Sequence, residues 1–299
     1  PQFKIDLKGA AYDIDTSFRC PRRYWLSQVL GWHTEPLFLR QNDMQEASSN
    51  FPNPREFGLI MHRLLEVGLP NPINISENTA NLSVEWHIEN ENKLLDVDTI
   101  ESVLSEYGIT KENKKFDSTK NRILAISELF ERQKLGLLLK GKEMNGLFAE
   151  GLRTELPIRH IHHFGDLRLE LTRSTPFGDQ LDAVVDEASM IFEGRIDLVI
   201  ALRDKKNNGY LQVVDLKTKG CLDDFSIDMI NPQPLQVIDE DSMHPMPTTL
   251  AEAELLQSYR LQLTLYSMAL ESIESRKPNH MRRRILPPAI LVGASGRMI

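Results

Sequence analysis

Cysteine is nearly absent from this chain of 299 residues, in which Cys20 and Cys221 are the only two. A cubane iron–sulfur cluster takes four thiolates, so two cysteines exclude one. Long hydrophobic runs are also missing: no apolar segment has membrane-spanning length, and no basic, apolar-cored leader is visible. We therefore expect a cytoplasmic protein with no membrane partner, in which a disulfide does not form.

Basic residues do not predominate either. The chain has 35 Lys and Arg against 43 Asp and Glu, which gives a net charge of -8. Domains that bind nucleic acid by bulk attraction are usually basic, so the total charge argues against that mode of binding. A local basic stripe is enough for phosphate contact, however, and an acidic centre that holds a metal ion lowers the total.

The most informative stretch is residues 192–219, which predicts two strands joined by a polar turn. A cluster of turn formers at 203–209 separates two apolar, β-branched runs. Side chains alternate along a strand, so Asp197 points away from the apolar face, and Asp215 and Lys217 project together. An antiparallel pairing would bring these three together, and a hard divalent cation would compensate their burial. A solvated hairpin face is the alternative interpretation.

One helix is predicted before this hairpin in the sequence and another after it. An N-cap at Asn53 followed by a first-turn proline predicts a helix that runs to about Leu69 and carries His62. A capping box at Thr249 predicts a second helix that reaches about Ser275. One face of this second helix carries Tyr259, Gln262 and Tyr266.

The residues alone leave structural alternatives open for both helices. A lone helical histidine such as His62 is more often a packing or capping residue than a ligand. An aromatic stripe at helical spacing is usually core, which would account for the tyrosines. Gln262 is harder to explain as packing, because a buried amide needs hydrogen-bond partners.

Four segments, in this order, resemble the PD-(D/E)xK nuclease superfamily, and most closely the RecB-like branch found at the C-terminal end of helicase-nuclease subunits. They are Gly58-x-x-x-His62, Gly194-Arg195-Ile196-Asp197, Val214-Asp215-Leu216-Lys217-Thr218 and Tyr259-x-x-Gln262-x-x-x-Tyr266. The string that begins at Cys20 also looks like the start of many RecB-like domains. In the iron–sulfur members this cysteine is a cluster ligand, with three more after the last helix. Here that tail has none, so no iron–sulfur cluster is expected.

The resemblance implies hydrolysis of phosphodiester bonds assisted by Mg2+ or Mn2+. Asp197, Asp215 and Lys217 would be the catalytic residues, with the lysine orienting a water and stabilising developing negative charge. The metal ligands would be His62, Asp197, Asp215 and the backbone carbonyl of Leu216. The DNA-binding candidates are Gln262, Tyr266, Thr218 and Tyr259, and Glu155 is a weaker candidate for the site.

We expect one α/β domain over residues 1–299, with a central mixed sheet flanked by helices. A helical insertion is expected over about 71–150, and the catalytic sheet and following helix over about 151–299. The resemblance implies a restriction-endonuclease-like core for this architecture.

The function implied is that of a deoxyribonuclease, specifically an exonuclease that acts on single-stranded DNA ends in recombination and repair. Two alternatives stay open. The first is a non-catalytic DNA-binding or scaffold module of a helicase-nuclease complex. The second is a nuclease that cuts only when it is assembled with a helicase. Loss of Asp197, Asp215 or Lys217 would have indicated the non-catalytic module, and all three are present.

Overall fold

The structure of the protein is a computed structural model that describes residues 7–9, 50–69, 95–139, 142–163, 189–222, 247 and 249–299. Some expectations fall outside these ranges, including those for Cys20 and for the first part of the helical insertion. No helix among the described residues combines the length and the apolar character that crossing a bilayer requires.

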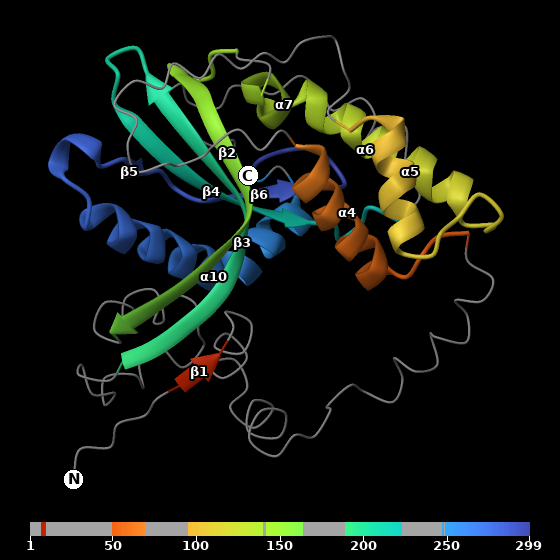
Figure 1. Cartoon of the computed structure of the whole chain (residues 1–299), viewed down its shortest axis with the longest axis horizontal. Helices are drawn as coiled ribbons and strands as arrows, with labels where there is room; N and C mark the ends of the chain where they lie inside the picture. The colour runs from red at the N-terminus through yellow and green to blue at the C-terminus, as the bar shows by residue number, and fades with distance from the viewer. Residues whose placement is uncertain are drawn as a thin grey trace.

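A mixed six-stranded sheet forms the centre of the described structure (Figure 1). β2, β3 and β4 are antiparallel neighbours, whereas β1 is parallel to β3, and β5 and β6 are parallel to β4. β2 and β3 curl away from the body of the molecule at one end (Figure 1). The strands are β1 (Leu7–Gly9), β2 (Leu147–His163), β3 (Ser189–Asp204), β4 (Gly209–Lys217), β5 (Arg284–Ile285) and β6 (Ala289–Val292).

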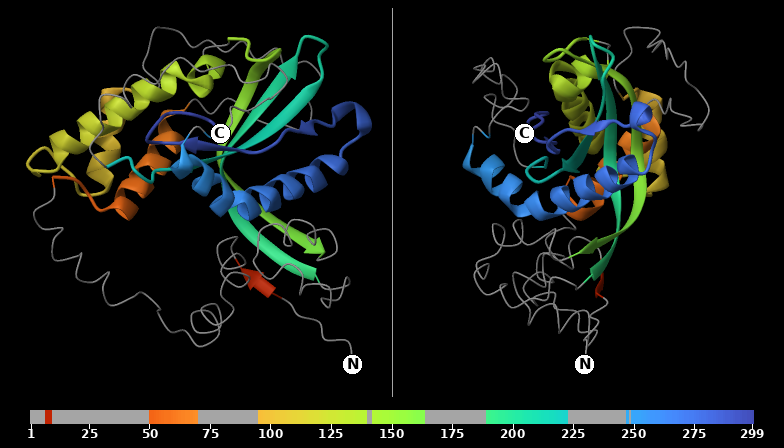
Figure 2. Two further views of the ribbon diagram at one scale, coloured as in Figure 1. Left: turned by 180° about the vertical axis from the view of Figure 1, so that it is seen from behind. Right: turned by 90° about the vertical axis from the view of Figure 1, so that its left-hand side faces the viewer.

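Helices flank this sheet, which confirms the predicted α/β class (Figures 1 and 2). The long helix α10 packs against β2, β4, β5 and β6, while α4 and α7 contact β2. The α-helices are α4 (Pro54–Gly68), α5 (Val97–Glu106), α6 (Phe116–Arg132), α7 (Lys134–Leu139) and α10 (Leu250–Ser275), and a 3-10 helix, η4, spans Asn279–Met281.

The two helices that reach the site begin at the predicted caps. The Asn53 side chain accepts a hydrogen bond of 2.8 Å from the Glu56 amide, and the Thr249 hydroxyl accepts one of 3.1 Å from the Glu252 amide. α4 buries the apolar stripe Phe57, Ile60, Met61, Leu64 and Leu65. Each such side chain contributes about 1.5–3 kcal/mol when fully buried, so packing of this face holds α4 on the sheet.

The β3–β4 turn forms where the sequence predicts it. Asp204 accepts hydrogen bonds of 2.8 Å from the backbone amides of both Lys206 and Asn208. Asn207 takes the left-handed conformation, with φ of 69°, which asparagine tolerates better than most residues. This turn sets the register that pairs Leu198 with Val214, next to the predicted carboxylates.

Candidate active site and metal centre

The site lies at an interruption in the pairing of β3. β2 follows one edge of β3 along its length, so β4 and β1 share the other edge. β4 pairs with Leu198–Arg203 and β1 with Met190–Phe192. Residues 193–197 have no partner strand on that edge among the described residues. Side chains therefore reach backbone groups that a neighbouring strand would otherwise cover.

Asp197 lies at the end of this unpaired stretch, and its carboxylate accepts a hydrogen bond that a backbone carbonyl would otherwise accept. Its Oδ2 accepts a hydrogen bond of 2.8 Å from the backbone amide of Leu216 on β4. Its Oδ1 lies 3.4 Å from His62 Nδ1 on α4. The carboxylate thus joins an interior strand to a helix that is distant in sequence, and its side chain is 13% exposed.

Glu155 on β2 completes a cluster with Asp197 and His62. One Glu155 carboxylate oxygen lies 3.7 Å from His62 Nδ1, and one ligand atom from each of the three residues lies within 4.8 Å of the others. Glu155 has a left-handed backbone with φ of 49°, which is uncommon for a residue with a Cβ atom. Such strain collects at functional sites, where the surrounding structure maintains it.

The charges in this cluster determine the protonation of its histidine. Burial alone lowers the pKa of His62, but its hydrogen bonds to Asp197 and Glu155 outweigh this effect and raise the pKa to about 10. Burial raises the pKa of Asp197, but other contacts hold this pKa below its ordinary value. They are the hydrogen bond to His62, the positive charges of His62 and Lys217, and the hydrogen bond from the Leu216 amide. The imidazolium is therefore the counterion of two carboxylates, a position that suits a cation.

The donor set fits a divalent metal ion. Two carboxylates and one imidazole are ligands that Mg2+ or Mn2+ accept, and hard cations prefer oxygen. Each donor needs to be deprotonated for this purpose, so binding of an ion would require His62 to lose its proton. Asp197 and His62 were predicted as ligands from the sequence, and Glu155 was the weaker candidate.

Asp215 and Lys217 form a second, deeper pair on β4. Asp215 is 1% exposed, and its Oδ2 lies 2.6 Å from Lys217 Nζ. Burial and the charge of Asp197 raise the pKa of Asp215 to about 7, in spite of Lys217. The parallel strand β6 fixes this segment by pairing Asp215 with Ile290 and Lys217 with Val292.

Helix α10 supplies polar contacts to this pair. The Gln262 amide nitrogen lies 3.2 Å from Asp215 Oδ1 and 3.2 Å from the Tyr266 hydroxyl. The Tyr266 hydroxyl also lies close to the backbone of Arg195, inside the unpaired stretch of β3. Lys217 Nζ lies over the ring of Tyr259, 3.9 Å from its centroid. Gln262 thus has the polar partners that its burial requires.

The glycines of the recognised motifs mark close approaches of these elements. A Cβ on Gly194 would lie 3.0 Å from Tyr266 Cε1 and 3.1 Å from the end of the Phe192 ring. A Cβ on Gly58 would lie 3.2 Å from the Thr218 hydroxyl, so α4 approaches the end of β4 closely there. Thr218 therefore lies at the junction of α4 and β4.

The structure brings the predicted residues into one region, but the ligand atoms that meet within 4.8 Å belong to His62, Asp197 and Glu155, and Asp215 is not among them. For Leu216 the observed contact is its amide, which donates to Asp197, and its carbonyl stays a predicted ligand. The ring of Tyr259 faces Lys217, and contact of this residue with DNA stays a prediction. Sequence reasoning missed Arg195, whose guanidinium lies 3.5 Å from Glu155. Its position two residues before Asp197 on the same strand is the signal that would have identified it.

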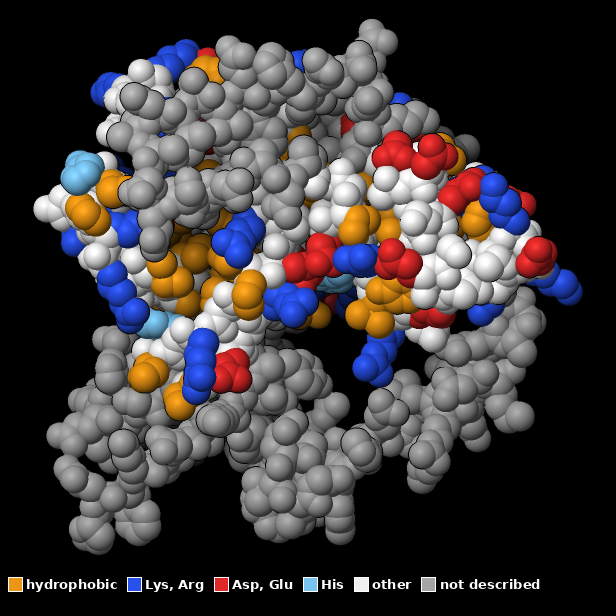
Figure 3. Space-filling view, in the orientation of Figure 1, with side chains coloured by type: hydrophobic (Ala, Val, Ile, Leu, Met, Phe, Trp, Pro, Cys, Tyr) orange, Lys and Arg blue, Asp and Glu red, His pale blue; other side chains and the backbone are white. Residues whose placement is uncertain are grey.

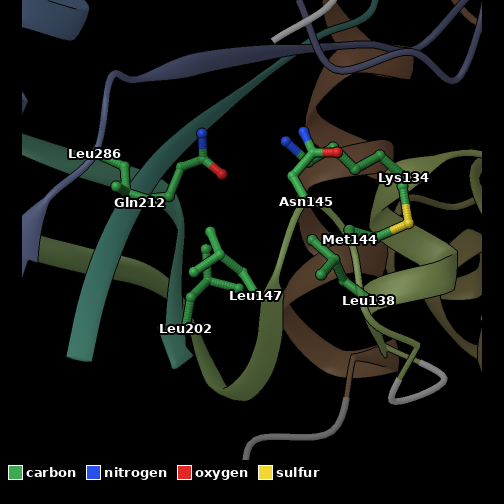
Figure 4. Close-up of a pocket in the computed structure, with 8 residues that line it drawn as sticks. All are labelled: Lys134, Leu138, Met144, Asn145, Leu147, Leu202, Gln212 and Leu286. Atoms are coloured by element: carbon green, nitrogen blue, oxygen red, sulfur yellow. The ribbon is translucent and has the colours of Figure 1, made fainter. Parts of the chain in front are cut away.

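Charged side chains of both signs and histidine gather near the middle of one face, close to α4 (Figure 3). A separate small pocket lies between α7 and the sheet and shares no residue with the site (Figure 4). Burial lowers the pKa of Lys134 at its edge. The pocket is lined by Lys134, Leu138, Met144, Asn145, Leu147, Leu202, Gln212 and Leu286.

Comparison with known proteins agrees with this geometry. A sequence model described as the PD-(D/E)XK nuclease superfamily matches residues 10–289 of the 299-residue chain. No curated protein sequence matches the chain. The matched range contains the whole site, from His62 to Tyr266, and a mixed sheet flanked by helices is consistent with the fold of these metal-dependent nucleases. The chain belongs to the PD-(D/E)XK nuclease superfamily.

Proposed function

We propose that this protein is a divalent-metal-dependent deoxyribonuclease whose active centre consists of His62, Glu155, Asp197, Asp215 and Lys217. The observation that carries the proposal is the meeting of three ligand groups within 4.8 Å beside a buried aspartate–lysine pair. A phosphodiester repels nucleophiles because it is anionic. Concentrated carboxylates would repel it further unless a cation were held between them.

The metal ligands in this proposal are His62, Asp197 and Glu155, whose ligand atoms meet within 4.8 Å, together with the predicted ligands Asp215 and the Leu216 carbonyl. When bound, Mg2+ or Mn2+ supplies charge neutralisation at the phosphate and lowers the pKa of a coordinated water. Asp197 accepts the Leu216 amide through Oδ2, so its Oδ1, on the His62 side, is the oxygen available to the ion.

Lys217 has the position of an electrostatic catalyst. Its side chain is 17% exposed, and Asp215 holds the ammonium at 2.6 Å. An ammonium has three N–H groups, and one contact to Asp215 leaves others for a water or a phosphate oxygen. A fixed positive charge beside a developing negative charge stabilises the transition state without reorganisation.

The remaining residues would position the DNA strand. Gln262 donates both to the Tyr266 hydroxyl and to Asp215, so contact of these two α10 side chains with DNA would place the DNA backbone relative to that carboxylate. Thr218 lies where α4 meets β4 and is a candidate phosphate contact.

We further propose an exonuclease of the RecB-like branch that acts on single-stranded DNA ends in recombination and repair, with a helicase as partner. The order of the Gly-x-x-x-His, Gly-x-x-Asp, Asp-x-Lys and Gln-x-x-x-Tyr segments supports this assignment, since the resemblance is closest to that branch. On the same ground we propose a single nuclease domain over residues 1–299, with a helical insertion over about 71–150.

A cleavage assay tests the proposal. The purified chain is incubated with single-stranded DNA, duplex DNA or RNA labelled at either end, with Mg2+, Mn2+ or chelator. We expect metal-dependent cleavage of single-stranded DNA by wild type and by Lys205→Ala, a control at an exposed lysine, and none by Lys217→Ala. Full activity of Lys217→Ala would refute the mechanism. DNA binding without cleavage would support the scaffold alternative, and cleavage only after addition of a helicase would indicate an assembly-dependent enzyme.

A further inference from the structure

The contact between Tyr259 and Lys217 gives the tyrosine a role that its place in the motif does not reveal. Lys217 Nζ lies 3.9 Å from the Tyr259 ring centroid and 2.6 Å from Asp215 Oδ2. We propose that Tyr259 is a positioning residue whose ring holds the Lys217 ammonium against Asp215, in place of a direct contact with DNA. The proposal rests on the proposed function, because it assigns a purpose to the placement of Lys217.

A lysine needs such a restraint more than most side chains. Its flexible four-carbon stem carries about 2 kcal/mol of rotamer entropy, and its ammonium is a compact charge with no preferred direction. Tyrosine has only two side-chain torsions, and Tyr259 is partly buried and packed against the hydrophobic core. A ring supported from behind in this way is a rigid surface against which the ammonium can rest.

A ring also holds the ammonium without neutralising it. A second carboxylate at this position would bind Lys217 more tightly, but it would add negative charge beside Asp197 and Asp215, where an anionic phosphate has to approach. The attraction between an ammonium and an aromatic face adds no net charge. The contact with the ring is electrostatic and is not a hydrogen bond to an acceptor atom. The N–H groups of Lys217 that do not meet Asp215 therefore stay available to a water or a phosphate.

Helix α10 contacts both Asp215 and Lys217. Tyr259 and Gln262 are three residues apart on α10, so they lie on neighbouring positions of one helix face. Tyr259 meets the ammonium of Lys217, while the Gln262 amide meets the carboxylate of Asp215 at 3.2 Å. The relative placement of Asp215 and Lys217 is therefore determined by α10 as well as by the backbone of β4.

Two substitutions separate the ring from the hydroxyl. Tyr259→Phe keeps the aromatic face, whereas Tyr259→Leu keeps an apolar side chain without it. We expect Tyr259→Phe to retain the wild-type kcat and Tyr259→Leu to lower kcat by about 3- to 30-fold, the range that a cation–π contact predicts. KM should stay unchanged in both variants. If Tyr259→Phe loses as much activity as Tyr259→Leu, the hydroxyl is the functional group and the proposal is wrong.

A direct role in DNA binding is distinguished by affinity. DNA binding is measured in the Lys217→Ala background, where the ring has no ammonium to hold, with and without Tyr259→Leu. We expect equal Kd values for the two proteins. A higher Kd after Tyr259→Leu would mean that the ring contacts DNA and would overturn the proposal. Tyr210→Leu, at another partly buried tyrosine on the core, controls for the loss of aromatic packing.

A spectroscopic measurement keeps the test independent of cleavage. In protein labelled with 13C at lysine Cε, an aromatic face this close should shift the Lys217 Hε resonances upfield, and Lys217→Arg identifies those signals. We expect the upfield shift in wild type and Tyr259→Phe and its loss in Tyr259→Leu. A wild-type protein without the shift contradicts the ring contact. A wild-type protein with the shift but without nuclease activity, either alone or with a helicase, refutes the proposed function and leaves the ring contact established.

Discussion

Replacement of Asp215 by asparagine should make the metal-free protein more stable. The carboxylate is 1% exposed, and burial together with the charge of Asp197 raises its pKa from 3.8 to about 7. A carboxyl whose pKa is higher in the folded state stabilises the fold while it is protonated. This stabilisation is complete below pH 3.8 and is lost as the pH rises through about 7.

The size of the effect follows from the shift. At 1.36 kcal/mol per pKa unit, the ionised carboxylate costs at most about 4 kcal/mol above pH 7. Asparagine avoids this cost but leaves Lys217 without its partner, which offsets part of the gain. We therefore expect Asp215→Asn to raise the free energy of unfolding by about 1–3 kcal/mol at pH 8, or Tm by about 2–10 °C.

Thermal unfolding in EDTA from pH 4 to pH 8 measures this difference directly. The gain in Tm for Asp215→Asn should be small at pH 4 and largest at pH 8. The matched control is Asp117→Asn at an exposed aspartate, which should change stability by less than about 0.5–1 kcal/mol at every pH. An Asp215→Asn variant that is less stable than wild type at pH 8, or a gain that does not depend on pH, would refute the reasoning.

Three other predictions concern the metal ion and the glycines. In a thermal shift assay, Mg2+ or Mn2+ at 100 times its Kd should stabilise wild type by about 2.7 kcal/mol. His62→Ala should weaken the affinity for the metal ion. If the metal titration of this variant is unchanged, His62 has only a packing role. Gly194→Ala should lower stability by about 1–3 kcal/mol by denaturant unfolding and reduce cleavage, because its Cβ would press on the rings of Tyr266 and Phe192. Gly58→Ala, whose Cβ meets only the Thr218 hydroxyl, should unfold at the same denaturant concentration as wild type or a higher one, and a larger loss there than at Gly194 would contradict the packing described.

Local rules predicted the elements that carry the site. The caps at Asn53 and Thr249 are where the sequence indicates, because a side-chain oxygen three residues before a free amide satisfies it without tertiary contacts. The β3–β4 turn follows from Asp204 and Asn207 for the same reason. Alternation along β4 correctly placed Asp215 and Lys217 on one side, where the two side chains meet.

Tertiary features had no comparable signal. The sequence predicted strands from about residue 151, but β2 begins at Leu147, because pairing with the end of β3 extends it. The left-handed backbone of Glu155 cannot be read from a glutamate flanked by ordinary strand residues. The orientation of Tyr259 toward Lys217 depends on how α10 crosses β4, which helical periodicity does not specify.

Residues 193–197 of β3 have no partner strand on one edge among the described residues, so single substitutions in this site should affect both fold and activity. A complete ladder would satisfy backbone groups with other backbone groups and would leave side chains free. Here the Asp197 carboxylate accepts a hydrogen bond from the Leu216 amide, and the Tyr266 hydroxyl lies close to the backbone of Arg195. A residue that closes the sheet in this way cannot be removed without exposing a buried backbone group, at a cost of about 1–3 kcal/mol. Loss of activity in Asp197→Ala is therefore weak evidence for metal binding, whereas Asp197→Asn, which keeps an oxygen for Leu216, separates the ligand from the structural role.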